Sequence, residues 1–345
     1  MRNLKRMQRI DTIQAEAFRE LLSKSRKIVT VSHTHPDGDA LGSSLGMTEW
    51  LRSVGKEATA VFPDPVPATL RFMLDCRSGA CLNFKDHPER VRQLLAGCDL
   101  VICLDFPNFS RTETLEGILS ALPVPKVLID HHLSPDTASF SLCFSETEIS
   151  SASELVFWVL DALGAELPLP AATALMTGMT TDTNNFSNSV WPSTFEMASR
   201  LLALGVDRDA ILDAVNRDYE ERRLRAMGCL LGKMTITGKG VAYMILDAAV
   251  RERFGLEDGE TEGFVNLPLS IKNVRMSIFL KETDGHFRVS IRSRKGTSAR
   301  RMAAGHFHGG GHEQAAGGKL YFPEDIPAPA DAAAYIERVT NEDLD

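Results

Sequence analysis

The chain has 345 residues, 43% of them hydrophobic and 24% charged, and its formal net charge is −8 at pH 7. These values are typical of a globular protein with room for two compact domains, and the acidic balance argues against duplex DNA as a partner. No segment resembles a secretory signal or reaches the length of a membrane span, and the six cysteines show no metal-ligand spacing. We therefore expect reduced core cysteines, a cytoplasmic location and no membrane partner.

Over the first half of the chain, short apolar runs alternate with helical patterns, which predicts a parallel sheet covered by helices on both faces. The expected strands are 27–33, 57–62, 100–106 and 126–131. The expected helices are 40–55, 110–123, 151–163, 170–181 and 193–204. Ser110 and Glu113 have the spacing of a capping box at the start of the helix 110–123.

The pattern changes in the second half of the chain. Residues 215–228 are polar and helical in pattern, and from about residue 233 strands with hairpin-like turns are followed by a short helix and a glycine-rich loop. The predicted fold class is α/β, with a doubly wound parallel sheet over residues 1–192, a helical linker over 193–228 and a smaller α+β domain over 229–345. We expect a cleft between the two domains, where a ligand would bind.

Ligand-type side chains follow three of the predicted strands and end one of the predicted helices. They are His33, His35, Asp37 and Asp39 in "SHTHPDGD", Asp105 in "VICLDF", Asp130, His131 and His132 in "LIDHH", and Asp182 in "AATALMTGMTTD". Taken singly, each segment could be a turn or a helix cap. Because ligands bind outside the carboxyl ends of the strands in an open parallel sheet, the segments should instead converge on one site.

Carboxylates and imidazoles together suit two divalent cations, which turn a water into hydroxide and clamp a phosphoryl oxygen. The mixed ligands favour manganese, and the absence of cysteine argues against a structural zinc. The second domain adds a basic cluster, which is either a solvated strand face or a phosphate site beside the glycine-rich loop. The cluster comprises Arg288, Arg292, Arg294, Lys295, Arg300 and Arg301, and the loop contains Gly309, Gly310, Gly311 and His312.

Five segments together resemble the motifs of one family. "SHTHPDGDALGSS", "VICLDFPNFSR", "LIDHH" and "TGMTTDTNNF" resemble, in order, the four motifs of the DHH phosphoesterases. "FHGGGHEQAAGG" resembles the Gly-Gly-Gly-His loop of the DHH-associated C-terminal domain. Within the family, a two-domain chain of this size is most similar to the bacterial nanoRNases that also dephosphorylate 3′-phosphoadenosine 5′-phosphate (pAp).

The resemblance implies two divalent metal ions, Mn²⁺ first, with Mg²⁺ or Co²⁺ as alternatives. One ion would be held by His33, Asp37 and Asp105, and the other by Asp39, Asp105, His131 and Asp182. The implied catalytic set is His132 beside the reacting phosphate, Asp130 to orient a histidine, and Asp105 shared by both ions. The implied substrate contacts are Arg111, Arg292, Arg294, Gly309, Gly310, Gly311 and His312.

The chain departs from the family pattern at several positions. His35 stands where an asparagine is usual, Asn184 and His308 stand where glycine is usual, and Ser187 stands where an arginine is frequent. None of these is a predicted metal ligand. The departures therefore bear on which nucleotide is preferred.

The sequence favours an Mn²⁺-dependent phosphoesterase that hydrolyses short oligoribonucleotides, dinucleotides included, and pAp by attack of a metal-bound hydroxide. The alternatives are a manganese pyrophosphatase or exopolyphosphatase, a cyclic dinucleotide phosphodiesterase and, from another class, an inactive nucleotide-binding regulator. The expected partners are short single-stranded RNA and mononucleotides. The sequence leaves the oligomeric state open, a homodimer included.

Overall fold

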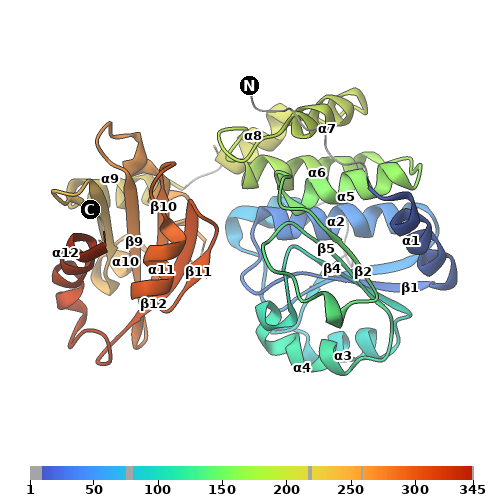
Figure 1. The fold of residues 1–345 in the computed structure, drawn as a ribbon, viewed down its shortest axis with the longest axis horizontal. Coiled ribbons are helices and arrows are strands. Elements are labelled where there is room, and N and C mark those ends of the chain that lie inside the picture. The colour runs from blue at the N-terminus through green and yellow to red at the C-terminus, as the bar shows by residue number, and fades with distance from the viewer. Residues whose placement is uncertain (1–9, 75–80, 217–219, 258, 344–345) are drawn as a thin grey trace. The chain divides into compact units, whose positions relative to one another are not determined.

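A computed structural model describes residues 10–74, 81–216, 220–257 and 259–343 (Figure 1). The chain divides into two compact units, Met1–Asp218 and Tyr219–Asp345. Cys76 and part of the predicted connecting helix, residues 217–219, lie outside the described residues. Among the described residues, no helix is long and apolar enough to cross a membrane.

The first unit contains a six-stranded sheet in the order β3-β2-β1-β4-β5-β6, in which every pair of neighbours is parallel. Its strands are β1 (Lys27–Val31), β2 (Glu57–Phe62), β3 (Cys81–Asn83), β4 (Leu100–Leu104), β5 (Lys126–Asp130) and β6 (Leu142–Ser145). This is the expected doubly wound sheet, with two short edge strands, β3 and β6, that the sequence pattern did not reveal. The order of the strands reverses between β1 and β4, and such a switch point is where ligands bind in open α/β sheets.

Helices cover both faces of this sheet (Figure 1). One face is covered by α1 (Thr12–Lys24), α2 (Gly38–Ser53), α5 (Ala152–Ala162) and α6 (Leu169–Asp182), with α7 (Pro192–Ala203) and α8 (Arg208–Asn216) packed on α6. The other face is covered by α3 (Pro88–Ala96) and α4 (Glu116–Ala121). Strand side chains alternate between the two cores: Ile102 faces the first, while Val101 and Cys103 face the second.

Helices α2 and α6 approach each other closely because glycines line their contact. A Cβ atom added to Gly42 would lie 2.6 Å from the Cα of Gly178, and one added to Gly38 would lie 2.3 Å from the Oγ1 of Thr181. Real side chains could not occupy these positions without moving the helices. The contact brings the beginning of α2, with Asp39, beside the end of α6.

The predicted capping box at Ser110 is wrong. The N-cap is Asn108, whose Oδ1 accepts a hydrogen bond from the Ser110 main-chain N at 3.2 Å, and a 3₁₀ helix, η2 (Phe109–Leu115), begins there. Glu113 cannot complete a capping box because its φ of 41° interrupts the helix before α4 begins. The asparagine two residues upstream caps the chain first, since Asn is among the most favoured N-cap residues.

The second unit contains a mixed sheet in the order β11-β12-β10-β9-β8-β7, in which only β8 and β9 are parallel among the described strands. Its strands are β7 (Thr235–Ile236), β8 (Val241–Leu246), β9 (Met276–Thr283), β10 (His286–Ser293), β11 (Gly310–Gly311) and β12 (Ala315–Tyr321). This agrees with the expected α+β character of the second half. The glycine-rich segment forms the edge strand β11, which the sequence pattern presented as a loop.

Helices also lie on both faces of the second sheet. On one face, α11 (Ala299–His306) and α12 (Ala332–Asp343) share an apolar core with β8, β9, β10 and β12. On the other face, α9 (Glu221–Gly232), α10 (Ala248–Phe254) and the 3₁₀ helix η4 (Phe264–Ser270) share a core with β8 and β9. That second core contains no residue of β10 or β12.

Among the described residues, the cysteines Cys81, Cys98, Cys103, Cys143 and Cys229 are free. Cys98 and Cys103 are buried, as expected for small core residues. Burial raises the pKa of the Cys98 thiol to about 11, so this thiol stays protonated at neutral pH.

Candidate active site

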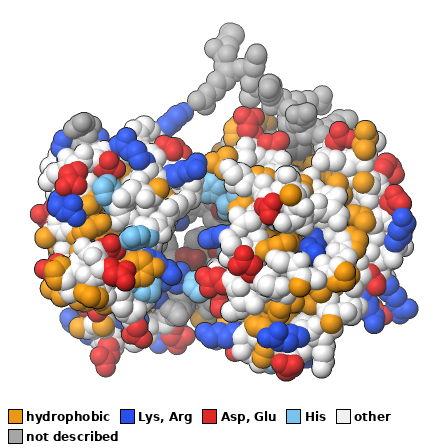
Figure 2. All heavy atoms as spheres, turned by 60° about the horizontal axis from the view of Figure 1, so that its bottom comes forward, with side chains coloured by type: hydrophobic (Ala, Val, Ile, Leu, Met, Phe, Trp, Pro, Cys, Tyr) orange, Lys and Arg blue, Asp and Glu red, His pale blue; other side chains and the backbone are white. Residues whose placement is uncertain are grey.

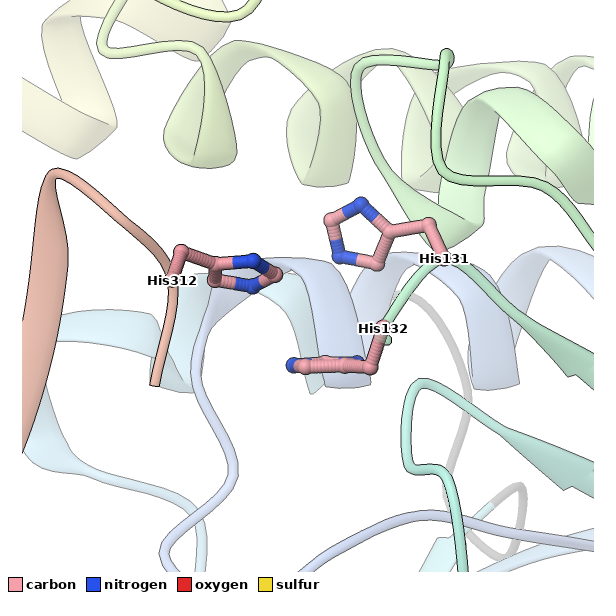
Figure 3. Close-up of side chains that lie close together, drawn as sticks. All are labelled: His131, His132 and His312. Carbon is pink, nitrogen blue, oxygen red and sulfur yellow. The ribbon is translucent and has the colours of Figure 1, made fainter. Parts of the chain in front are cut away.

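The predicted ligands meet at the carboxyl edge of the first sheet. His33 follows β1 by two residues, Asp105 directly follows β4, and His131 and His132 directly follow β5, where their rings project from the strand end (Figure 3). Asp39 lies in the first turn of α2, and Asp182 is the last residue of α6. The convergence expected from the sequence is therefore present in the structure.

The first group of ligand atoms comprises His33, Asp37 and Asp105. The Nε2 of His33 lies 3.4 Å from the Oδ2 of Asp105 and 3.9 Å from the Oδ1 of Asp37. The Nδ1 of His33 lies 2.8 Å from the carbonyl oxygen of Thr34, which orients the ring so that Nε2 faces the acids. His33 and Asp105 are buried, while the Asp37 side chain is half-exposed.

The second group comprises Asp39, Asp105 and His131, with Asp182 next to it. The Nε2 of His131 lies 3.4 Å from the Oδ1 of Asp105, 3.9 Å from the Oδ2 of Asp39 and 3.8 Å from the Oδ2 of Asp182. One imidazole nitrogen therefore stands among three carboxylates. Asp105 belongs to both groups, with one oxygen toward His33 and the other toward His131.

Asp39 is held by the beginning of α5, a helix that the sequence predicted without predicting this contact. Its Oδ2 accepts a hydrogen bond from the Ala152 main-chain N at 2.6 Å, and its Oδ1 accepts one from the Ser153 main-chain N at 2.9 Å. Both donors belong to the first turn of α5, whose N-terminus favours an anion.

His132 is oriented by Asp130. The Nδ1 of His132 lies 2.8 Å from the Oδ1 of Asp130, whose side chain is fully buried, and 3.7 Å from the Oδ1 of Asp105. A buried carboxylate on Nδ1 fixes the orientation of an imidazole ring. The predicted pairing of Asp130 with a histidine is thus observed, and the partner is His132.

Asp105 carries two marks of a functional residue. Its φ is 64°, in the left-handed region that non-glycine residues rarely adopt, directly at the switch point of the sheet. Its Oδ1 is buried and, among the described residues, makes no hydrogen bond of good geometry, although the Nε2 of His131 lies 3.4 Å away. The Oδ2 of Asp130 is also buried without a hydrogen-bond partner among the described residues. A buried carboxylate oxygen without a partner is costly unless something else binds it. The donors at the site are all carboxylate oxygens and imidazole nitrogens, so the site suits divalent metal ions.

The acids and imidazoles of the site shift one another's pKa values. Burial lowers the pKa of His33 and of His131, but the Asp105 carboxylate and the other neighbouring acids outweigh it and raise these values to about 9 and about 10. Burial raises the pKa of Asp105, yet the rings of His131 and His33 hold it well below its usual range. In the metal-free site at neutral pH, both imidazoles are therefore positively charged, and Asp105 is ionised between them.

Two further carboxyl groups shift in the other direction. Burial, reinforced by the charges of Asp105 and Asp182, raises the pKa of Asp39 well above its ordinary value. The partial burial of Asp182, opposed by His131 and reinforced by Asp105, raises its pKa to about 6. The carboxylates at this site repel one another, and a cation bound among them would relieve that repulsion.

His35 and Arg111 flank the site without joining either group of ligand atoms. The His35 main-chain N and Nδ1 both lie 2.9 Å from the Oδ2 of Asp64, a residue that the sequence reasoning did not single out. The carbonyl oxygen of Arg111 accepts a hydrogen bond from the Thr34 main-chain N at 2.9 Å, and its side chain is exposed. The backbone of Arg111 therefore contacts the loop that contains His33.

In the second unit, Arg292 and His312 flank Ala315. Arg292 of β10 is the register partner of Ala315 in β12, and the His312 main-chain N donates a hydrogen bond to the Ala315 carbonyl oxygen at 2.8 Å. His312 extends from the turn after β11 (Figure 3). The structure thus brings Arg292 and His312 to one region of the second sheet.

The glycines of the loop have different surroundings. A Cβ atom at Gly309 would lie 2.0 Å from the Gly317 carbonyl oxygen, and one at Gly311 would lie 2.7 Å from that of Ala315. These two glycines allow β11 to approach β12. Gly310 has open space around its Cα, so it is the one of the three that leaves room for a ligand.

Arg294 is engaged with the protein backbone. Its guanidinium donates hydrogen bonds to the carbonyl oxygens of Leu269, Ile271 and Lys272 at 2.6, 3.1 and 3.1 Å. These bonds hold the segment that follows η4. A contact between Arg294 and substrate stays a prediction.

The doubly wound sheet, with acids and imidazoles gathered at its switch point, defines an α/β protein with a candidate site for divalent metal ions. The family model "DHH family, N-terminal domain" matches residues 27–179, and the "DHHA1 domain" model matches residues 238–336. The protein named bifunctional oligoribonuclease and PAP phosphatase NrnA from Thermus thermophilus is 32% identical over 296 residues, covering 85% of this chain and 84% of that protein. The chain belongs to the DHH family.

Solved structures agree with this assignment. An exopolyphosphatase-related protein from Bacteroides fragilis superimposes with a TM-score of 0.91 and 35% sequence identity, covering 98% of each chain. RecJ from Thermus thermophilus, in complex with Mn²⁺, superimposes with a TM-score of 0.56 and 16% identity, covering 96% of this chain and 54% of that one. The second likeness concerns the fold alone. The resemblance inferred from the five sequence motifs is confirmed.

Proposed function

We propose that this protein is a cytoplasmic, metal-dependent phosphoesterase that hydrolyses short oligoribonucleotides and pAp. The observation that carries the proposal is the pair of acid and imidazole groups that share Asp105 at the switch point of a DHH-family sheet. The name of the Thermus thermophilus relative, which matches most of both chains, supports the substrate class.

We assign one metal ion to His33, Asp37 and Asp105, and a second to Asp39, Asp105, His131 and Asp182. Divalent ions bound there would activate a water molecule and neutralise charge on the phosphate. The mixture of carboxylate and imidazole donors favours Mn²⁺, with Mg²⁺ and Co²⁺ as alternatives. The α5 N-terminus keeps Asp39 in place, and the Thr34 carbonyl does the same for His33.

We assign His132 to the reacting phosphate. Its Nδ1 faces the fully buried Asp130, so Nε2 is the nitrogen that would meet the substrate. An imidazole that is protonated beside a carboxylate stabilises negative charge and can donate a proton to a leaving oxygen. Asp130 is a positioning residue in this proposal, because it acts through His132.

The second unit would bind the nucleotide. Arg292 provides a forked donor for phosphate, Gly310 leaves space for a close approach, and His312 lies on the other side of Ala315. Arg111, next to the His33 loop, would contact a phosphate from the first unit. A preference for substrates of few nucleotides belongs to the same proposal.

The test is a substrate panel with metal-stripped protein, in which pAp, a diribonucleotide, longer RNA, a cyclic dinucleotide and pyrophosphate are each supplied with Mn²⁺, with Mg²⁺ or with chelator. We expect hydrolysis of pAp and the diribonucleotide with Mn²⁺ and none with chelator. Cleavage of pyrophosphate alone would instead identify a pyrophosphatase, and cleavage of the cyclic dinucleotide alone a cyclic dinucleotide phosphodiesterase. Tight nucleotide binding without any hydrolysis would favour the regulator.

A further inference from the structure

On the face of the second sheet opposite α11 and α12, strands β10 and β12 carry basic and small side chains. In β10, Val289 and Ile291 are buried in the core beneath α11 and α12, so the alternate residues Arg288, Ser290 and Arg292 lie on the opposite face. The core on that opposite face draws its strand residues from β8 and β9 only. Figure 2 shows histidine, basic, acidic and hydrophobic side chains mixed on the visible side of the second unit, at the left.

Three cations stand side by side across this face. Arg288 is the register partner of Lys281 in β9 and of Lys319 in β12. We call Lys281, Arg288 and Lys319 the basic row. Arg288 and Lys319 are exposed, and within the described part of the chain neither side chain makes a hydrogen bond or an ion pair. Arg288 and Lys319 are like charges directly opposite on neighbouring strands, which is destabilising, and an anion bound to the two would offset their repulsion.

On β10 and β12, only small residues lie on this face between the basic row and the level of Arg292. Gly317 in β12 is the register partner of Ser290 on one side and of Gly310 on the other. A Cβ atom at Gly310 would meet nothing within 4 Å. A flat strip of this kind lets a ligand lie against the sheet backbone.

Aromatic rings lie beyond the basic row. His286 and Tyr321 are register partners with ring centroids 5.5 Å apart, and the ring of His308 lies 5.4 Å from that of Tyr321. His308 is fixed by Asp325, whose Oδ1 lies 2.9 Å from its Nε2. Aromatic rings on an open sheet face stack with the bases of single-stranded nucleic acid, while neighbouring cations bind the phosphates.

We propose that this face binds the nucleotides of an RNA substrate beyond the one held near Arg292 and His312, with phosphates on the basic row and a base against Tyr321. The inference rests on the proposed function and deepens it. Arg288 is four residues from Arg292, about 13 Å along a strand. Stacked nucleotides rise about 3.4 Å each, so roughly four would span this distance. A mononucleotide such as pAp would not reach the row, whereas an oligoribonucleotide would.

The arrangement favours a single strand over a duplex. Paired and stacked bases hide their faces from Tyr321 and His286, and the net charge of −8 disfavours broad contact with a polyanion. Local cations beside aromatic rings fit a short single strand.

The experiment compares the double variant Arg288→Gln/Lys319→Gln with wild type. Binding of a fluorescent pentaribonucleotide is measured by anisotropy over a range of salt concentrations with chelator present, and turnover of pAp, a diribonucleotide and the pentaribonucleotide is measured with Mn²⁺. Arg300→Gln/Arg338→Gln is the matched control, because these exposed arginines belong to α11 and α12 on the other face. Unfolding curves establish that each variant is folded.

We expect the double variant to bind the pentaribonucleotide about tenfold more weakly, the loss that follows removal of a charged hydrogen bond. Its salt slope should fall by about 1.4, because each phosphate contact with a single strand contributes roughly 0.7. Turnover of pAp should stay at the wild-type rate. Tyr321→Leu should weaken pentaribonucleotide binding without changing the salt slope, since it removes a ring and no charge.

Unchanged pentaribonucleotide binding in the double variant, or an equal loss in the control variant, would overturn the inference. So would a wild-type protein that does not bind the pentaribonucleotide. Failure of the proposed function is a separate result, because it shows as absence of hydrolysis of every substrate by wild type with Mn²⁺. In that case the binding measurement still decides the role of the basic row.

Discussion

The two units concentrate like charges in opposite ways. In the first unit, Asp39 and Asp105 are buried beside Asp182, and the ring of His131 stands among them. In the second unit, Arg288 and Lys319 are exposed side by side, with no acid opposite either of them in the register of the sheet. Burial makes the first arrangement sensitive to protons and metal ions, while exposure makes the second sensitive to salt and to large anions.

The largest effect should come from breaking the shared ligand of the first unit. Asp105→Asn removes the charge between His33 and His131, so we expect at least about 10³-fold lower turnover, the upper end of the loss for one electrostatic group. Elemental analysis should find less manganese per chain than in wild type. Asp64→Asn, at a neighbouring loop, is the control and should cost less than about tenfold. Wild-type turnover in Asp105→Asn would end the two-metal assignment.

The next effect concerns the backbone of the second unit. Gly309→Ala would place a Cβ 2.0 Å from the Gly317 carbonyl oxygen, and we expect a loss of about 3 kcal/mol in the free energy of unfolding. Gly310→Ala, the adjacent position with open space, should lose less than about 1 kcal/mol. Chemical unfolding of both variants is the measurement. Equal losses would show that the close contact of β11 with β12 does not control stability.

The third prediction concerns the pH dependence of metal binding in the first unit. The pKa values of about 9 and about 10 mean that His33 and His131 are protonated at neutral pH without metal. Metal binding must release these protons, so the apparent affinity for each ion should rise with pH, about tenfold per unit up to those pKa values. Titration calorimetry in buffers of different ionisation enthalpy measures the release. Affinity that is independent of pH near neutrality would contradict the assignment.

Pentaribonucleotide binding by the second unit provides the contrast in the same experiment. Lysine and arginine keep their charge through neutral pH, so this binding should change little over the pH range in which metal affinity rises.

The smallest expected effect is an increase in stability. Arg288→Gln relieves repulsion with Lys319, and we expect the free energy of unfolding to rise by about 0.5 kcal/mol at low salt. High salt should abolish the gain because it screens exposed charges. A loss of stability at low salt would show that the basic row is compensated within the protein. Unfolding curves at two salt concentrations measure the difference.

Much of the first unit could be predicted because periodicity and topology determine it. Buried parallel strands give continuous apolar runs, so the ends of 100–106 and 126–131 were visible in the sequence, and the rule for open sheets placed Asp105 and His131 at one edge. The short edge strands β3 and β6 were missed because three or four residues carry too little pattern.

The contacts that orient the ligands could not be predicted in the same way. Asp39 accepts hydrogen bonds from residues 113 and 114 positions away, and no local pattern links these segments. The basic row required the register of β9, β10 and β12, which an amino-acid sequence does not specify without the turns between them. The charged residues were visible, but their alignment was not.

Three of the four departures from the family pattern, His35, Asn184 and His308, share one backbone feature. His35, Asn184 and His308 have φ values of 52°, 46° and 47°, in the left-handed region that asparagine and glycine adopt most readily. His35 and His308 are each held by an aspartate, Asp64 and Asp325.

The glycine contact between α2 and α6 has a consequence for ion selectivity. Asp39 belongs to one of these helices and Asp182 to the other, and Gly42 and Gly178 hold the two backbones at their distance of approach. Proteins discriminate between divalent ions partly through the size and rigidity of the cavity. The radius of the ion that fits between Asp39 and Asp182 would therefore be set by two residues that have no side chain and never touch it.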